Sequence, residues 1–355
     1  MRVKDFASDN SKSAYKTEFW EEELVMTKSI SELCELQIEN EKILRKASFL
    51  ELDDIIKVGA LFYTVREITP DAEKIRACKE ILKRKTGVFS NFRGFLRFAI
   101  QVKMAISPDP ETYLDAVLAI YKKLAEGRIL TGEILAMTAM TIYDLSGERD
   151  TDSVIATVRE AYAKMKQKHK FLTDENDLSY ISMMVLSGED VDRKLEEAEM
   201  LYVSLKERFR MPSDTAQSAS MVLSLSRKPA EQKAESFISF YKALKEVKHA
   251  TSKGKSMSVY AAFTDLDAPR ELLVNEIGEA DEWLKHQKGY GILSSSDVRR
   301  VMAAALVLQQ HELQGAVPVH TEAATVVSQL IAEEVIFMMI MLIVISVSVS
   351  TTVNS

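Results

Sequence analysis

Two polar residues in one short stretch, His169 and Asp177, have the side-chain types needed for acid–base chemistry. A histidine and a carboxylate can exchange a proton with a substrate if a turn brings them together. Polar loop residues are also better site candidates than core residues. Helix capping is the structural alternative: His169 would end one helix, and Thr173 or Asp174 would begin the next. The stretch therefore predicts a candidate catalytic pair, His169 and Asp177, beside a capping interpretation.

Other stretches imitate known site motifs without completing them. Residues 254–256 end like a phosphate-binding loop, but the motif requires glycine where His249 stands. A calcium-loop pattern that begins at Asp174 fails at Leu178 and Ser179. The five histidines do not pair at metal-ligand spacing, so we expect no metal site, and no motif indicates a cofactor.

A repeat of about 40 residues organises the helices that would carry these residues. A Leu or Ile followed by a polar residue recurs, and the second members of these pairs lie 38, 39, 41, 39, 41 and 42 residues apart. The pairs are Ile68-Thr69, Ile106-Ser107, Leu145-Ser146, Leu186-Ser187, Leu225-Ser226, Leu266-Asp267 and Leu308-Gln309. Helix-capping residues, Pro or acids follow most of them, which indicates that a new helix begins there.

The helices on either side of each pair differ in character. The one that follows is amphipathic, as in residues 114–124, and carries an aromatic residue that we expect to pack against its neighbour. The one that precedes is apolar nearly all round, as in residues 134–143, and must be covered on most sides. We therefore predict an all-α fold, an α-solenoid or αα-superhelix of about seven helix-pair repeats.

The predicted organisation has three parts: an N-terminal helical cap over residues 1–50, the repeat domain over 51–312, and a linker with an apolar helix over 313–355. Formal net charge is −7, which argues against nucleic acid as a partner. Two cysteines do not make a disulfide framework and indicate a reducing compartment. Residues 1–29 lack the apolar core of a signal peptide, so the expected location is the cytoplasm.

The apolar run Val335–Val349 has three interpretations. Its 15 residues, extended to 19 by the uncharged Ser350–Val353, fall short of the roughly 20 apolar residues that span a membrane, and no Lys or Arg follows Arg300. A solenoid needs its last repeat covered, so capping or self-association is favoured over a membrane anchor.

Four stretches resemble a bacterial family known as domain of unknown function 4003. They are residues 89–94 (FSNFRG), 168–186 (KHKFLTDENDLSYISMMVL), 217–226 (QSASMVLSLS) and 288–307 (KGYGILSSSDVRRVMAAALV). The resemblance covers roughly residues 15–345. It implies an intracellular bacterial protein and adds no reaction.

Individual residues match the family pattern in three places. They are Phe89, Ser90 and Arg93; His169, Phe171, Leu172, Thr173 and Asp177; and Gly289, Gly291 and Arg299. The resemblance thus implies Arg93, His169, Phe171, Thr173, Asp177 and Arg299 as binding candidates. The family has Pro in place of Lys170 and His in place of Met221, so a role that needs the second His would be absent here.

The sequence favours a non-enzymatic scaffold that binds another protein through a groove or a basic edge. Basic residues end several amphipathic helices, as in residues 83–85, 164–170 and 206–210. They either offset the negative helix terminus or form a rim for an acidic partner. One alternative is an enzyme whose pocket gathers His169, Thr173, Asp177 and Arg93. Another is a scaffold tethered to a membrane by residues 335–349.

Overall fold

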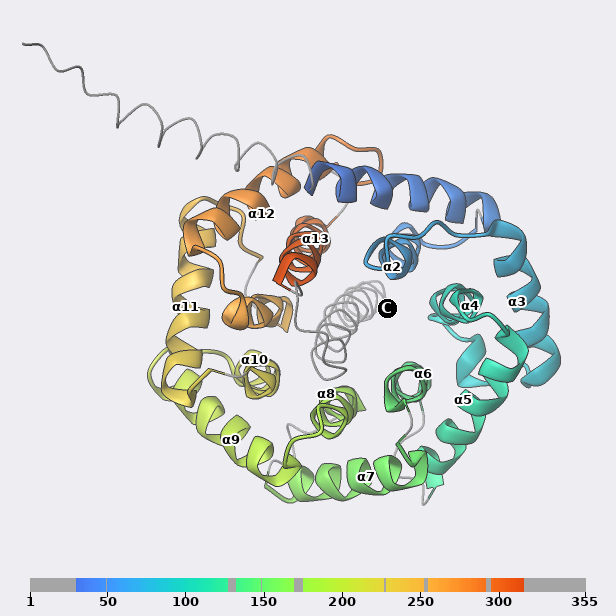
Figure 1. The fold of residues 1–355 in the computed structure, drawn as a ribbon, viewed down its shortest axis with the longest axis horizontal. Helices are drawn as coiled ribbons and strands as arrows, with labels where there is room; N and C mark the ends of the chain where they lie inside the picture. Colours follow the sequence, from blue (N-terminus) through green and yellow to red (C-terminus); the bar gives the residue numbers. More distant parts are fainter. Residues whose placement is uncertain are drawn as a thin grey trace, which may run out of the picture.

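The computed structural model describes residues 30–48, 50–126, 132–147, 149–168, 175–226, 228–251, 255–291 and 295–315. Throughout these residues the secondary structure is helical, with no strand, which confirms the predicted all-α class. Figure 1 shows two concentric rings, in which the chain alternates between an outer and an inner helix.

The outer ring holds seven helices of the described chain. They are the helix over residues 30–47, α3 (Ala72–Lys85), α5 (Pro110–Ala125), α7 (Thr151–Lys168), α9 (Val191–Glu207), α11 (Ala230–Glu246) and α12 (Arg270–Lys285). The inner ring also holds seven: α2 (Asp53–Thr64), α4 (Arg97–Ile106), α6 (Glu133–Ser146), α8 (Glu175–Leu186), α10 (Ser213–Leu225), the 3₁₀ helix η3 (Lys255–Asp265) and α13 (Ser296–Gly315). A short 3₁₀ turn, η1 (Asn91–Arg93), precedes α4.

Aspartate caps begin four successive outer helices. Asp71, Asp109, Asp150 and Asp190 each accept hydrogen bonds from two backbone N–H groups of the first turn. These N–H groups lack partners within the helix, and the carboxylate accepts their hydrogen bonds. Its negative charge is also attracted to the partial positive charge at the helix N-terminus. Successive caps lie 38, 41 and 40 residues apart, close to the spacing found in the sequence.

The inner helices are buried on every side, whereas the outer helices are buried on one face. Every residue from Ile55 to Thr64 of α2 is buried, and the same holds for residues 134–142 of α6 and 215–224 of α10. The outer helix α5 buries a single stripe that includes Leu114, Val117 and Leu124. This difference follows the all-round and one-faced apolar patterns of the two helix types.

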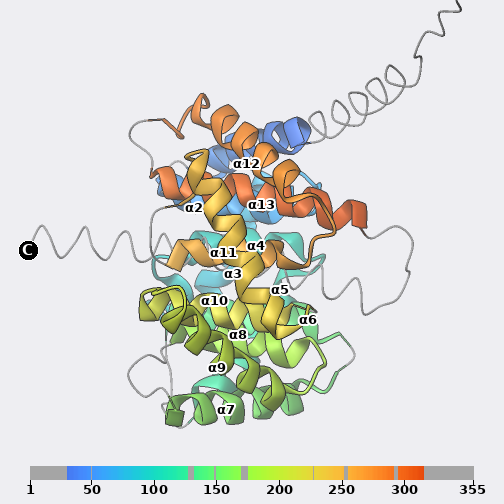
Figure 2. The ribbon, with the colours of Figure 1, turned by 90° about the vertical axis from the view of Figure 1, so that its left-hand side faces the viewer.

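The ring closes where the helix over residues 30–47 lies beside α12, as both views show (Figures 1 and 2). This helix belongs to the segment expected to form an N-terminal cap, and it takes a place in the outer ring. The hydroxyl of Tyr290, after α12, donates a hydrogen bond to Glu41 across 249 positions of sequence. The two ends of the described chain therefore meet instead of forming the open ends of a solenoid.

Candidate functional site

Asp177, one half of the predicted acid–base pair, is a buried residue in the first turn of α8. Its Oδ2 accepts a hydrogen bond of 3.0 Å from the Nε2 of Gln217, which lies on the neighbouring inner helix α10. A bond between buried side chains on two helices fixes both of them. Asp177 therefore ties α8 to α10.

A cavity of about 300 Å³ lies on the other side of Gln217, between α7, α9 and α10. We call it the α9 pocket. Its lining residues are Lys164, Met165, Gln167, Lys168, Asp192, Leu195, Glu196, Ala198, Glu199, Tyr202, Gln217, Ser220 and Met221. Helix α9 contributes six of them, at the i, i+3 and i+4 spacing of one helical face. Tyr202 is the aromatic residue expected on this amphipathic helix.

Ionic groups surround the mouth of the α9 pocket. The ammonium of Lys164 lies 2.8 Å from both carboxylate oxygens of Asp192 and 3.1 Å from Glu160. The bond to Asp192 raises the pKa of Lys164 above its usual value. Glu196 and Glu199 add two acidic groups from the next turn of α9. With Lys168, the lining therefore carries two basic and three acidic side chains.

The lining residues suit binding better than covalent catalysis. Met165, Leu195, Ala198 and Met221 offer apolar surface, and a volume of about 300 Å³ is at the small end of ligand pockets. The Ser220 hydroxyl donates to the Gln217 carbonyl, and no histidine stands among the described lining residues to activate it.

Of the other predicted site residues, His169, Phe171 and Thr173 lie outside the described residues. Arg93 lies in η1, which packs on α3, α4 and α6, and it donates to the Thr86 carbonyl at 3.4 Å. Arg299 is buried on α13, where its Nε donates to Asp281 at 2.6 Å. The structure thus places the described candidates in three different parts of the ring, each with a partner from the fold.

The region around Arg299 is a polar network that closes the ring. Lys57 lies 4.6 Å from the centre of the Tyr290 ring and 2.9 Å from Asp54. Glu41 accepts from Tyr290 and from Gln37, and burial raises the pKa of Glu41. We call Glu41, Lys57 and Tyr290, with Arg45 and Asp53 beside them, the closure seam.

Gly289 explains part of the KGYG motif that resembles the family pattern. Its backbone has φ of +93°, a left-handed conformation that favours glycine. A Cβ at this position would also come within 3.0 Å of the Asp53 carboxylate. The motif thus shapes the turn that delivers Tyr290 to the closure seam. The motif could be identified from the sequence, but the seam could not, because Glu41 and Tyr290 are 249 positions apart.

The basic ends of four outer helices pair with acids in the first two turns of the next outer helix. Arg84 lies 2.5 Å from Glu111, Lys85 lies 2.7 Å from Asp115, Lys164 lies 2.8 Å from Asp192, and Arg208 lies 2.7 Å from Glu235; Lys123 pairs with Asp152. We call these pairs the ion-pair ladder. Each acid occurs 27–30 residues after its cation, a spacing from which these pairs could have been predicted. A basic rim that awaits an acidic partner is therefore not needed to explain these residues.

Neither a metal site nor a membrane span occurs in the described part of the chain. Among these residues, no three His, Cys, Asp or Glu side chains gather to hold a metal ion. None of the helices that the structure describes is long and apolar enough to cross a bilayer. The apolar run Val335–Val349 lies outside the described residues.

These features define a class: an all-α protein with two concentric rings of helices, closed by a buried polar seam. The family model described as "Protein of unknown function (DUF4003)" matches residues 41–344, which is most of the chain. The chain belongs to this family, as the sequence resemblance predicted. No curated protein and no solved structure matches it.

Proposed function

We propose that this protein is a non-enzymatic interaction scaffold that binds another protein at the α9 pocket. The single observation that carries the proposal is exposed apolar surface beside a cavity. Met200 and Val203 of α9 are 60% and 40% exposed. They lie four residues after the pocket residues Glu196 and Glu199, hence on the same helical face.

The lining of the pocket defines the chemistry of the partner. An apolar side chain fits the surface formed by Met165, Leu195 and Met221, with Tyr202 as an aromatic contact. A Lys or Arg beside it would meet Glu196, which lines the same pocket. We therefore expect a partner segment with an apolar anchor flanked by a cation.

Two other surfaces support the proposal less well. The described residues of the inner helices are buried nearly all round, so they offer little exposed surface to another protein. The cations of the ion-pair ladder already have acidic partners on the fold. We further infer that the rings are a repeat array of about seven units, because the aspartate caps and the ion-pair ladder recur at near-constant spacing.

A photo-crosslinking amino acid at position 200, introduced in the native cell, tests the scaffold proposal. We expect one stoichiometric protein adduct that disappears when Glu196→Lys and Glu199→Lys are added. The same amino acid at position 89 is the control, because Phe89 is fully exposed on a loop before α4. Identical adducts at both positions, or none at position 200, would refute the proposal.

One observation favours the alternative of an enzyme with a pocket around His169, Thr173 and Asp177. Gln217 lines the α9 pocket and also donates a hydrogen bond to Asp177. A small molecule in the pocket would therefore be one residue away from that carboxylate. This alternative predicts that the purified protein retains a small metabolite, detectable by mass spectrometry after denaturation. The Gln217→Leu variant would lose that metabolite while keeping the protein adduct at position 200.

A further inference from the structure

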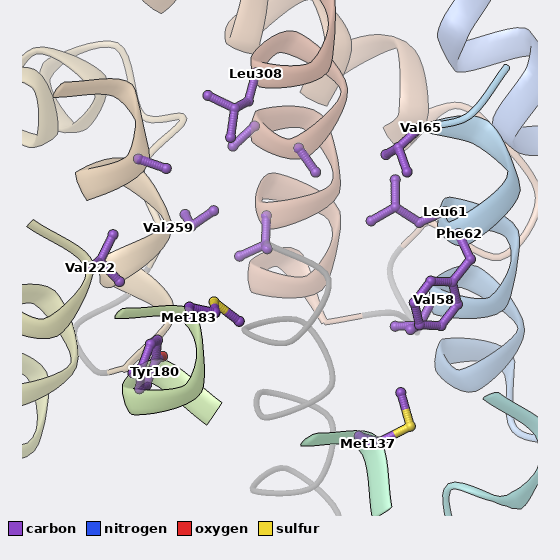
Figure 3. Close-up of a cluster of buried hydrophobic side chains, with 14 of the residues drawn as sticks. Val58, Leu61, Phe62, Val65, Met137, Tyr180, Met183, Val222, Val259 and Leu308 are labelled. Atoms are coloured by element: carbon purple, nitrogen blue, oxygen red, sulfur yellow. The ribbon is translucent and has the colours of Figure 1, made fainter. Parts of the chain in front are cut away.

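The inner helices direct apolar side chains toward the axis of the ring. Figure 3 shows this central cluster, whose labelled members are Val58, Leu61, Phe62, Val65, Met137, Tyr180, Met183, Val222, Val259 and Leu308. They come from α2 and its C-cap residue Val65, and from α6, α8, α10, η3 and α13, and each is 9% exposed or less. On these six of the seven inner helices, apolar and aromatic side chains therefore line the central space.

The number of inner helices determines how much space they leave on the axis. Packed helices lie about 8–10 Å apart, so a circle of seven places each helix axis about 9–12 Å from the centre. That distance is close to the separation at which one more helix would contact all seven. The axis has room for a single helix, and an empty space of this size would leave the apolar wall without packing partners.

We propose that the apolar run Val335–Val349 of this chain occupies the axis of the inner ring. The sequence holds no charged residue from Val335 to its last residue, so nothing in this stretch would bury a charge among apolar side chains. A segment apolar on all sides needs a cover on all sides, and the inner ring offers one. The inference is independent of the function proposed for the α9 pocket.

The length of the run matches the depth of the ring. As a helix, 15 residues extend about 22 Å. The inner helices α2, α6, α8 and α10 have 12, 14, 12 and 13 residues, or roughly 18–21 Å. The run therefore spans the apolar wall from one mouth of the ring to the other.

The connection from α13 is long enough for this placement. Helix α13 ends at Gly315, and 19 residues separate it from Val335. An extended chain of that length reaches about 60 Å, twice the roughly 30 Å length of the 20-residue α13. The run can therefore enter the ring from either mouth.

A membrane span and a seam between two copies both fit the sequence less well. A membrane span needs about 20 apolar residues and usually a basic flank, whereas Glu333 and Glu334 precede this run of 15. A seam between two copies covers one side of a helix and leaves the other sides in water.

Hydrogen exchange of the full-length wild-type chain, dilute, monomeric and without lipid, is the first test. We expect the amides of residues 335–349 to exchange at least about 100-fold slower than the intrinsic rate, because they would be enclosed and hydrogen-bonded. Exchange at the intrinsic rate would overturn the proposal. So would protection that disappears as the protein is diluted, since a second copy would then supply the cover.

A photo-crosslinking amino acid tests the position of the run, because it reacts inside a buried core without solvent access. In the full chain, such an amino acid at position 137 should yield an adduct with residues 335–349 of the same chain. At position 89 it should not, because Phe89 is fully exposed. Adducts only between chains, equal adducts from both positions, no adduct from position 137, or partition of the wild-type chain into vesicles of anionic and neutral lipid would each overturn the proposal.

Discussion

The closure seam and the α9 pocket both contain polar side chains of outer helices. The two regions differ in how far those side chains are buried. At the seam, Glu41, Lys57 and Tyr290 are at most 3% exposed and bond to one another. At the pocket, Lys164 pairs with Asp192, and both side chains are about half exposed. Buried polar groups are costly to separate, whereas exposed pairs contribute little. The seam is therefore suited to holding the ring together, and the pocket is suited to contact with a partner.

The largest expected effect is at the seam, in the variant Tyr290→Ala. It removes a fully buried ring and its contacts with Lys57 and Glu41, so we expect a loss of about 3–5 kcal/mol in unfolding free energy. Urea unfolding measures it. The matched control is Tyr143→Ala on α6, where the side chain is 39% exposed. Equal losses in the two variants would contradict the special role of the seam.

A buried ion pair beneath the α9 pocket gives the next effect. Lys233 of α11 is 1% exposed, and its ammonium lies 2.5 Å from Glu197 of α9. Lys233→Met leaves that carboxylate buried with only the more distant cations Arg193, at 3.9 Å, and Lys194, so we expect a loss of about 3 kcal/mol. The double variant Lys233→Met with Glu197→Met should recover part of it. A double variant less stable than the single one would show that the pair itself, and not the unpaired charge, sets the cost.

The variant Glu41→Gln should change how stability depends on pH. Because burial raises the pKa of Glu41, the folded state binds its proton more tightly than the unfolded state does. The resulting stabilisation is complete below the ordinary value of about 4.5 and is lost as pH rises through the raised pKa. Wild type should therefore lose stability relative to Glu41→Gln over that interval. Melting temperatures of both proteins, measured at several pH values, would run parallel if this assignment were wrong.

The smallest expected effect concerns the ion-pair ladder. Arg208 and Glu235 are 57% and 60% exposed, so Arg208→Gln should cost about 0.5 kcal/mol or less at low ionic strength. The difference from wild type should vanish near 1 M salt, because screening removes exposed Coulomb attraction. Urea unfolding at both ionic strengths measures it. A loss comparable to that of Lys233→Met would place the ladder among the interactions that hold the ring together.

Local sequence signals predicted the helices better than they predicted the sites. The pairs at Ile106, Leu186 and Leu225 mark the ends of α4, α8 and α10, because a following polar residue favours a new helix start. The pair at Leu308 falls inside α13, where the helix continues to Gly315. Periodicity reports which side of a helix is apolar, and this is a local property.

The sites depend on residues that the chain brings together from afar. An aromatic residue was expected on each amphipathic helix, and Tyr202 is that of α9, but the cavity beside it also needs residues of α7 and α10. Asp177 was identified as a polar loop candidate, yet its partner Gln217 lies 40 residues away. The seam joins residues 249 apart, and no spacing rule connects Glu41 with Tyr290.

Closure of the ring also sets an order for biosynthesis. The helix over residues 30–47 leaves the ribosome early, whereas Tyr290, which bonds to Glu41 of that helix, emerges after almost all the hairpins. A nascent chain can stack hairpins one by one, because each contacts its sequence neighbour. The ring cannot close until the turn that contains Tyr290 is synthesised. Throughout translation the growing arc thus carries two open ends, which a chaperone could shield until they join.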